Sequence, residues 1–269
     1  MLINLHSHLE GRVRPATAAA IARRLGAPEP PKGWEEALQL DRPADLTVYL
    51  TKVAATYPFF NSWDNVFRIA CEAVQDAAAD SHDYLELRFG PATHVRPGFS
   101  LDDVIAAACE GIAEGTRLTG MPAGLVVALL RHHDLDRNQQ VARAASRRAG
   151  RGVAGLDLAG DELLFPDLEP FKPAFAIAKA AGLGLTCHAA EAAPAEAARD
   201  AVDLLGVSRI GHGARRSKPH CRRQAEMFTP SRLSPGRRKM RSLADHSYFY
   251  SSFLGSFDIR SRRSCMSFI

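Results

Sequence analysis

The sequence predicts an α/β protein built around a parallel sheet, and it favours a TIM-type (β/α)8 barrel over an open doubly wound sheet. Short apolar runs rich in leucine and β-branched residues alternate with longer helical patterns. Polar residues follow several of these runs at the same end, where a βα barrel carries its site. No Gly-x-Gly-x-x-Gly follows the first run, so a dinucleotide-binding sheet is disfavoured.

The predicted strands are short runs of apolar and β-branched residues that are bounded by turn-forming or polar residues. They span residues 2–6, 84–88, 124–130, 152–158, 183–188 and 208–211. The predicted helices fill the connections, and the first has Pro15 in its first turn and Gly26 just past its end. The helices span residues 15–25, 64–79, 101–119, 135–149, 167–181 and 193–205. These elements make about six βα units, so the predicted barrel is incomplete.

The last 56 residues differ sharply in composition from the rest of the chain. Residues 1–213 contain 21 Lys and Arg against 27 Asp and Glu, whereas residues 214–269 contain 13 against 3. The sequence therefore predicts a truncated barrel over residues 1–216 and an irregular basic tail, rich in Ser and Arg, over residues 217–269. A shifted reading frame or a disordered segment explains such a tail better than a second folded domain does.

Overall composition is that of a soluble protein, with 46% hydrophobic residues and a net charge of +4. Residues 1–4 lack the basic and apolar segments of a secretory leader, and the longest apolar stretch, residues 121–130, is about half a membrane span. Five cysteines form no Cys-x-x-Cys pair, which is typical of a reducing compartment. We therefore expect a cytoplasmic protein without a membrane partner.

His6 and His8 lie one residue apart at the end of the first predicted strand. Side chains at positions i and i+2 lie on the same face of a strand, so both imidazoles can turn toward one point. Taken alone, such a pair is more often two surface histidines. The polar residues at the other strand ends shift the interpretation toward a site for one metal ion.

Further polar residues follow the later strands of the predicted sheet. His188 and Glu191 follow the fifth strand, and His212 lies between two glycines at the end of the sixth. Acidic residues, among them Glu86 and Asp157, lie near the ends of the second and fourth strands. Because the carboxyl ends of all the strands meet at the mouth of a barrel, we expect a single site built from several strands.

The chemistry of these residues indicates a metal-dependent hydrolytic site. Three imidazoles, from His6, His8 and His188, would hold Zn²⁺ together with at least one more ligand and leave a position for water. The metal would lower the pKa of that water toward neutrality. Glu191 can approach the substrate without binding the metal, which suits a proton-transferring acid. His212 could orient or deprotonate the water, and a buried core histidine is the alternative for this residue alone.

Five segments of the chain together form a recognisable set, found in the same order in one enzyme family. They read Leu5-His-Ser-His-Leu-Glu-Gly11, Tyr84-Leu-Glu-Leu-Arg-Phe-Gly-Pro91, Gly155-Leu-Asp-Leu-Ala-Gly-Asp-Glu162, Cys187-His-Ala-Ala-Glu191 and Arg209-Ile-Gly-His-Gly213. Over residues 1 to about 216 the chain resembles the adenosine deaminase family. That family is a metal-dependent amidohydrolase type of TIM barrel, which replaces the exocyclic amine of a purine by oxygen and releases ammonia.

The resemblance implies a role for each matching residue. His6, His8 and His188 would bind one zinc ion per chain, and Glu191 would protonate N1 of the purine ring as hydroxide attacks C6. His212 would manage the attacking water. The resemblance thus implies a zinc-dependent hydrolase that deaminates adenosine to inosine.

The substrate contacts implied by the resemblance involve His8, Glu10 and Gly160. Gly160 matches a glycine whose backbone N–H meets the purine ring, where the missing side chain matters. Glu10 stands where adenosine-specific members usually carry aspartate, and glutamate is more typical of members that act on adenine or on modified adenine nucleosides. The expected partner is a small-molecule purine nucleoside or base, with adenosine, adenine and an aminofutalosine-like nucleoside as the alternatives. Ala190 replaces a glycine usual in the family, and we expect it to shift the Glu191 loop.

The resemblance stops before the last two βα units of the family. The family's eighth strand ends in Ser-x-Asn-Thr-Asp-Asp-Pro, which provides a further metal ligand, and this motif does not occur in the sequence. Impaired activity, or a non-catalytic metal-binding remnant, is therefore the alternative to a working enzyme. The basic run of residues 237–241 matches no nucleic-acid-binding motif, and the Pro-Cys-x-x-Cys segment of the cytidine and nucleic-acid deaminases is absent. We expect no specific nucleic-acid partner.

Overall fold

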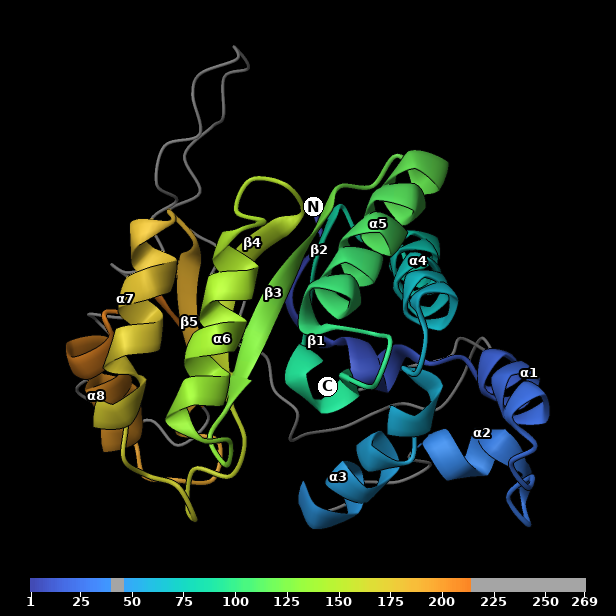
Figure 1. Cartoon of the computed structure of the whole chain (residues 1–269), viewed down its shortest axis with the longest axis horizontal. Helices are drawn as coiled ribbons and strands as arrows, with labels where there is room; N and C mark the ends of the chain where they lie inside the picture. The colour runs from blue at the N-terminus through green and yellow to red at the C-terminus, as the bar shows by residue number, and fades with distance from the viewer. Residues whose placement is uncertain (40–45, 214–269) are drawn as a thin grey trace.

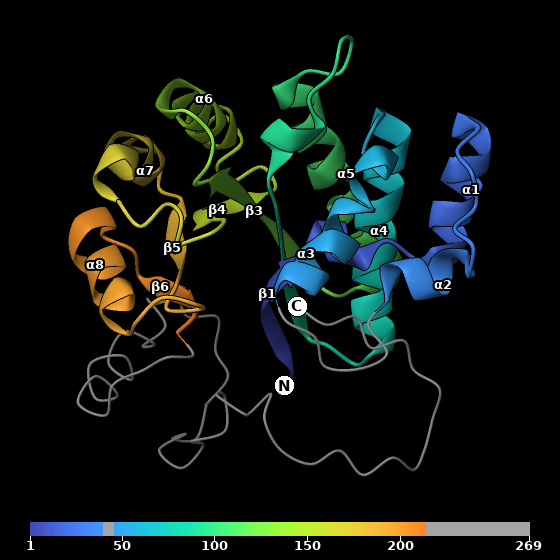
Figure 2. The same ribbon diagram turned by 90° about the horizontal axis from the view of Figure 1, so that it is seen from below.

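The computed structural model of the protein describes residues 1–39 and 46–213. Within these residues six strands form one parallel sheet, and their order in space follows their order in the chain. Figures 1 and 2 show the helices arranged around the outside of this sheet, which curls into a nearly closed barrel. The strands are β1 (Ile3–His8), β2 (Tyr84–Phe89), β3 (Ala123–Leu130), β4 (Val153–Ala159), β5 (Gly184–Ala189) and β6 (Arg209–His212).

The structure confirms the predicted fold class, a TIM-type barrel, and the described residues supply six of its strands. Every predicted strand is present, and its ends lie within two residues of the predicted ends. The largest difference is in β1, which continues two residues past its predicted end. As a result His6 and His8 both lie on the strand, and their side chains share one of its faces.

Parallel pairing aligns the carboxyl ends of the strands at one edge of the barrel. His8 of β1 pairs with Arg88 of β2, and His188 of β5 pairs with Gly211 of β6. The last pair between β5 and β6 joins Ala189 to His212. The polar residues that follow separate strands in the sequence are thus gathered at one end of the barrel.

Strand β2 shows how each strand separates two environments. Leu85, Leu87 and Phe89 are completely buried and belong to the hydrophobic core. Glu86 alternates with them, so its side chain lies on the opposite face of the strand, inside the barrel. There it forms a 2.7 Å ion pair with Arg209 of β6. Because β2 and β6 are not neighbours in the sheet, this ion pair crosses the barrel interior.

Eight helices surround the sheet in the described part of the chain. They are α1 (Pro15–Leu25), α2 (Gly33–Leu38), α3 (Leu46–Ala54), α4 (Trp63–Ala79), α5 (Leu101–Thr119), α6 (Leu135–Ser146), α7 (Lys172–Ala180) and α8 (Glu196–Leu205). Their ends follow standard capping chemistry. The Ser62 and Asp134 side chains accept backbone N–H groups at the starts of α4 and α6. Left-handed Gly26, Gly120 and Gly206 end α1, α5 and α8.

The first turn of α5 contains the adjacent aspartates Asp102 and Asp103. Asp103 forms a capping box with Ser100, and Asp102 forms an ion pair with Arg147 at 2.7 Å. Both acids therefore serve the outside of the barrel.

Three predicted helices are shorter than expected. The helix predicted over residues 135–149 ends at Ser146, and the helix predicted over residues 193–205 begins at Glu196. The helix predicted over residues 167–181 is a 3-10 turn (Glu169–Phe171) followed by α7. Proline explains this last difference, because Pro170 and Pro173 lack the N–H that a continuous helix needs.

Helices α2 and α3 and the 3-10 turn Tyr57–Phe59 were not expected from the sequence. Helix α2 has six residues and α3 has nine, so neither gives a long periodic pattern. The prolines at positions 28, 30 and 31 further obscure the pattern before α2.

The predicted basic tail, residues 217–269, lies outside the described residues, and the division of the chain near residue 216 stays a prediction. Among the residues that the structure describes, no helix has the length and apolar character needed to cross a membrane.

Helices α4 and α5 pack closely through glycine. A Cβ atom added at Gly111 of α5 would overlap with the carbonyl oxygen of Phe67 and lie 2.8 Å from the Cβ of Ala70, both in α4. Gly115, one turn later, faces Val74 in the same way. The two backbones therefore approach to a distance that leaves no room for a side chain at these positions.

We predict that Gly111→Ala destabilises the protein by about 1–3 kcal/mol, because overpacking outweighs the gain in helix propensity. Urea unfolding followed by circular dichroism measures the change. Glu110→Ala, at an exposed position of the same helix, is the control and is expected to shift stability by less than about 0.5 kcal/mol. An increase in stability for Gly111→Ala would contradict the close packing of the two helices.

Candidate functional site

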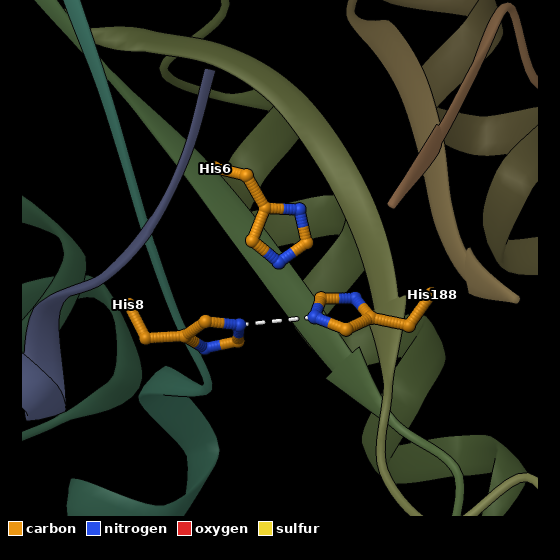
Figure 3. A group of neighbouring side chains, drawn as sticks. All are labelled: His6, His8 and His188. Atoms are coloured by element: carbon orange, nitrogen blue, oxygen red, sulfur yellow. Dashed lines mark hydrogen bonds between the residues drawn. The ribbon is translucent and has the colours of Figure 1, made fainter. Parts of the chain in front are cut away.

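Three histidines from two distant segments meet inside the mouth of the barrel. His6 and His8 come from β1, and His188 comes from β5. One ring nitrogen from each lies within 4.8 Å of the others, and Figure 3 shows the three rings converging. The Nε2 atoms of His8 and His188 are 2.9 Å apart. The structure thus brings the three predicted metal ligands together.

The chemistry of this cluster fits a zinc ion. Three imidazole nitrogens are a common ligand set for zinc, and a catalytic zinc site keeps a further position open. The Nε2 atom of His6 is buried and has no hydrogen-bond partner, as expected of a nitrogen reserved for a metal. Burial lowers the pKa of both His6 and His8, and the electrostatic influence of His188 and Arg88 lowers it further. These histidines are therefore neutral near pH 7, which is the form that binds metal.

His212 completes a group of four histidines. Its ring centroid lies 4.7 Å from that of His6 and 4.9 Å from that of His188. The residue has a φ of +68°, a left-handed conformation that turns the end of β6 toward the cluster. Gly211 is required beside it, because a Cβ there would lie 2.7 Å from the His6 ring. Burial, together with the electrostatic influence of the neighbouring His188, lowers the pKa of His212 to about 3.

Glu191 reaches the same group from the loop after β5. Its Oε2 lies 3.5 Å from Nε2 of His212, and its side chain is 31% exposed. Burial raises the pKa of this carboxyl group, which favours the protonated acid. The predicted catalytic pair, Glu191 and His212, is therefore adjacent to the predicted metal ligands.

Glu10 and Gly160 lie at the same end of the barrel but make different contacts. Glu10 follows β1 in the 3-10 turn Leu9–Arg12, where its Oε1 accepts the Gly90 N–H at 3.1 Å and lies 3.4 Å from His94. Its Oε2 is buried without a hydrogen-bond partner. Gly160 follows β4 with a φ of +112°, a backbone conformation that is strongly unfavourable for residues with a Cβ atom. Glu10 thus contacts the segment after β2, which contains Gly90 and His94.

Asp157 of β4 is a site residue to which sequence analysis gave no role. It is completely buried, and its Oδ2 lies 2.8 Å from Nδ1 of His188 and 3.0 Å from Arg88. Burial opposes its charge, but the electrostatic attraction of His188 and Arg88 and the contact with His188 outweigh that effect and lower the pKa of Asp157. A carboxylate on Nδ1 leaves Nε2 of His188 free to face His8. The signal in the sequence was an acid at an inward-facing position of an otherwise apolar strand.

Arg131, just after β3, was also missed. This buried side chain donates to the carbonyl oxygen of Phe165 at 2.9 Å and to that of His188 at 3.0 Å. It therefore ties the end of β5 to the loop after β4. Nothing in the local sequence distinguishes this arginine from the exposed ones.

Comparisons with known proteins agree with this geometry. The model of the adenosine deaminase family matches residues 2–225. An adenosine deaminase of Clostridium perfringens is 32% identical over 215 residues, and one of Clostridium botulinum is 34% identical over 218 residues. Each alignment covers 78% of this chain and 64% of the relative. The chain thus spans less than two thirds of the length of these relatives.

Solved structures of amidohydrolases and deaminases are also similar to this chain. An amidohydrolase from Burkholderia ambifaria with bound zinc is 30% identical, with a TM-score of 0.70 over 79% of this chain and 58% of that one. An adenine deaminase from Arthrobacter aurescens is 25% identical, with a TM-score of 0.71 over 84% of this chain and 67% of that one. An N6-methyl-AMP deaminase from Arabidopsis thaliana is also 25% identical, with a TM-score of 0.68 over 84% and 68%.

We predict that Asp157→Asn weakens zinc binding by about 10- to 100-fold, because asparagine cannot hold the Nδ1–H of His188 with a full negative charge. Competition with a chromophoric chelator measures the affinity, at a temperature where circular dichroism shows both proteins folded. Asp161→Asn makes the same chemical change at an exposed position four residues later and should leave the affinity unchanged. Equal affinities for all three proteins would show that Asp157 does not act on the metal site.

We also predict that the metal-free protein loses stability as the pH falls below about 6.5, the ordinary pKa of histidine. His6, His8 and His212 have lowered pKa values in the folded state, so the unfolded chain takes up protons that the folded chain cannot. Each of these histidines lowers the free energy of unfolding by at most about 1.4 kcal/mol per pH unit. The raised pKa of Glu191 has the opposite effect, because it favours the folded state as the pH falls. Three histidines outweigh this single carboxyl group.

Urea midpoints measured with a chelator between pH 7.5 and 5.5 test this pH dependence, and His212→Asn should make it shallower. A midpoint that stays constant or rises on acidification would contradict the prediction.

Proposed function

Because this chain belongs to the adenosine deaminase family, we propose that it catalyses the hydrolytic deamination of an aminopurine nucleoside, converting adenosine to inosine and ammonia. The observation that carries the proposal is the convergence of four histidines and a carboxylic acid from β1, β5 and β6 at the mouth of the barrel. This is the position at which βα barrels carry their active sites.

In this proposal His6, His8 and His188 hold one zinc ion per chain. The lowered pKa values of His6 and His8, which keep these two rings neutral, and the unpartnered Nε2 of His6 support it. When bound, zinc lowers the pKa of water and so supplies hydroxide at neutral pH. Asp157 keeps Nδ1 of His188 occupied, so the metal receives Nε2.

Glu191 acts as the proton donor. Its raised pKa supports a protonated carboxyl group, which can give a proton to N1 of the purine ring as the carbon beside it is attacked. His212 remains neutral because burial lowers its pKa, so its ring can accept a hydrogen bond and orient the attacking water. The 3.5 Å separation of the two side chains is consistent with roles at one reaction centre.

We assign substrate contacts to His8, Glu10 and Gly160. Gly160 leaves its backbone open toward the mouth, because it has no side chain and is exposed. Glu10 keeps one buried carboxylate oxygen without a partner, as expected of an acceptor that a donor on the substrate would satisfy. Glutamate at this position, together with the likeness to an adenine deaminase, favours adenine or a modified adenine nucleoside, such as an aminofutalosine-like compound, as the second candidate substrate.

We predict that the purified chain contains one zinc ion and deaminates at least one of adenosine, adenine and N6-methyl-AMP. Elemental analysis measures the zinc, and the change in ultraviolet absorbance together with the released amine measures turnover; the amine is ammonia from adenosine or adenine and methylamine from N6-methyl-AMP. Glu191→Gln should reduce kcat by about 10²- to 10⁴-fold, because amide groups cannot donate the proton.

Glu196→Gln, at an exposed position of α8, is the matched control and should retain full activity. A chain that contains stoichiometric zinc but turns over none of the three compounds would overturn the proposed activity and favour a non-catalytic metal-binding remnant.

A further inference from the structure

Glu162, in the loop after β4, is a buried acid to which the proposed reaction gives no role. Glu162 is only 6% exposed, although it lies near the mouth of the barrel. Its Oε2 accepts the N–H of Ala190 at 3.0 Å. Its Oε1 accepts the N–H groups of Ala192 and Ala193 at 2.5 and 2.7 Å. Both carboxylate oxygens are therefore bound to the loop that leaves β5.

The three N–H groups bound by Glu162 belong to residues on both sides of Glu191 in the sequence. Ala190 precedes Glu191, and Ala192 and Ala193 follow it. A carboxylate that accepts several backbone N–H groups holds them more strongly than a neutral acceptor does. The backbone on both sides of Glu191 is thus fixed to one side chain of a neighbouring loop.

The loop needs such a restraint, because Ala190 has a φ of +55°. This left-handed conformation is unfavourable for a residue with a Cβ atom, so the loop would relax if its hydrogen bonds were lost. The conformation of Ala190 sets the direction in which the chain continues to Glu191. A change there would move the Glu191 carboxyl group away from His212.

Glu162 is itself held in place by its own loop. Asp161 accepts the N–H groups of Leu163 and Leu164 at 2.9 and 3.0 Å, which closes a tight turn around Glu162. Arg131 then binds the carbonyl oxygens of Phe165 and His188, joining that loop to the end of β5. The two loops therefore form one hydrogen-bonded unit, with Glu162 at its centre.

We infer that Glu162 is a positioning residue, whose carboxylate fixes the loop of residues 190–193 so that Glu191 meets the substrate in the correct orientation. Glu162 contacts only backbone N–H groups in this loop, so it acts through Glu191 and takes no part in proton transfer. The inference rests on the proposed function, because it takes Glu191 as the proton donor. The negative charge of Glu162 also adds to the effect of burial in raising the pKa of Glu191.

The first test compares Glu162→Gln with Glu169→Gln. Glutamine has the same size as glutamate, but one of its terminal groups is an NH2 that cannot accept an N–H. Glu169 lies in the same connection between β4 and α7, and its side chain is 57% exposed. We expect Glu162→Gln to lower kcat by about 10- to 100-fold with KM changed by less than about 3-fold, because misorienting a catalytic group slows the chemical step. Zinc content and the activity of Glu169→Gln should remain unchanged.

A double-mutant cycle separates positioning from a general loss of structure. In the Glu191→Gln background there is no proton donor to misplace, so adding Glu162→Gln should cause no further loss of kcat. Equal losses in both backgrounds, or a parallel loss of zinc, would show that Glu162 only supports the fold and would overturn the inference.

Amide hydrogen exchange tests the same contact without any turnover. The N–H groups of Ala190, Ala192 and Ala193 should exchange at least about 10-fold faster in Glu162→Gln than in the unmodified chain, with α8 unaffected. If the chain does not deaminate aminopurines, the proposed function fails, and exchange alone then decides whether Glu162 holds the loop. Unchanged exchange at these three amides would overturn the inference in either case.

Discussion

Asp157 is completely buried inside the barrel, where its Oδ2 meets Arg88 from β2 and His188 from β5. A buried arginine without a partner costs several kcal/mol, so this carboxylate makes a charge at Arg88 tolerable. Arg88 in turn donates to the carbonyl oxygen of Leu5, on the strand that carries His6 and His8. One acid thereby links the strands that bear the three histidines. Both the charge balance of the interior and the orientation of the His188 ring depend on it.

The histidine cluster concentrates unfavourable groups in a small volume. Its rings lie about as close as packed aromatic residues, with centroids 4.6 to 5.3 Å apart, and burial lowers the pKa of His6, His8 and His212. Left-handed backbone at His212 and Ala190 adds local strain around the same centre. A metal ion would satisfy the nitrogens that have no partner in the protein. Such a concentration of strain and unsatisfied polar groups is typical of a site selected for chemistry rather than for stability.

Hydrogen bonds and ion pairs between strands hold this site together, both through the barrel interior and near its mouth. The ion pair of Glu86 with Arg209 joins β2 to β6 through the interior, and Arg131 joins the loops after β4 and β5 near the mouth. In the described part of the chain β1 pairs with β2 and β6 pairs with β5, each on one side. The close approach of His6 to Gly211 brings these two strands together at the histidine cluster.

The sequence by itself determined the order of the βα units, the face of β1 that His6 and His8 share, and the identity of five of the residues that meet at the site. These features follow from local periodicity and from motifs, and each of these signals lies within one short segment of the sequence. It did not reveal the short helices α2 and α3, whose few turns lie among prolines, nor the roles of Asp157, Arg131 and Glu162. Those roles depend on contacts between segments far apart in the chain. Only the curvature and register of the barrel decide which buried acid meets which histidine, because both arise from the packing of all the strands together.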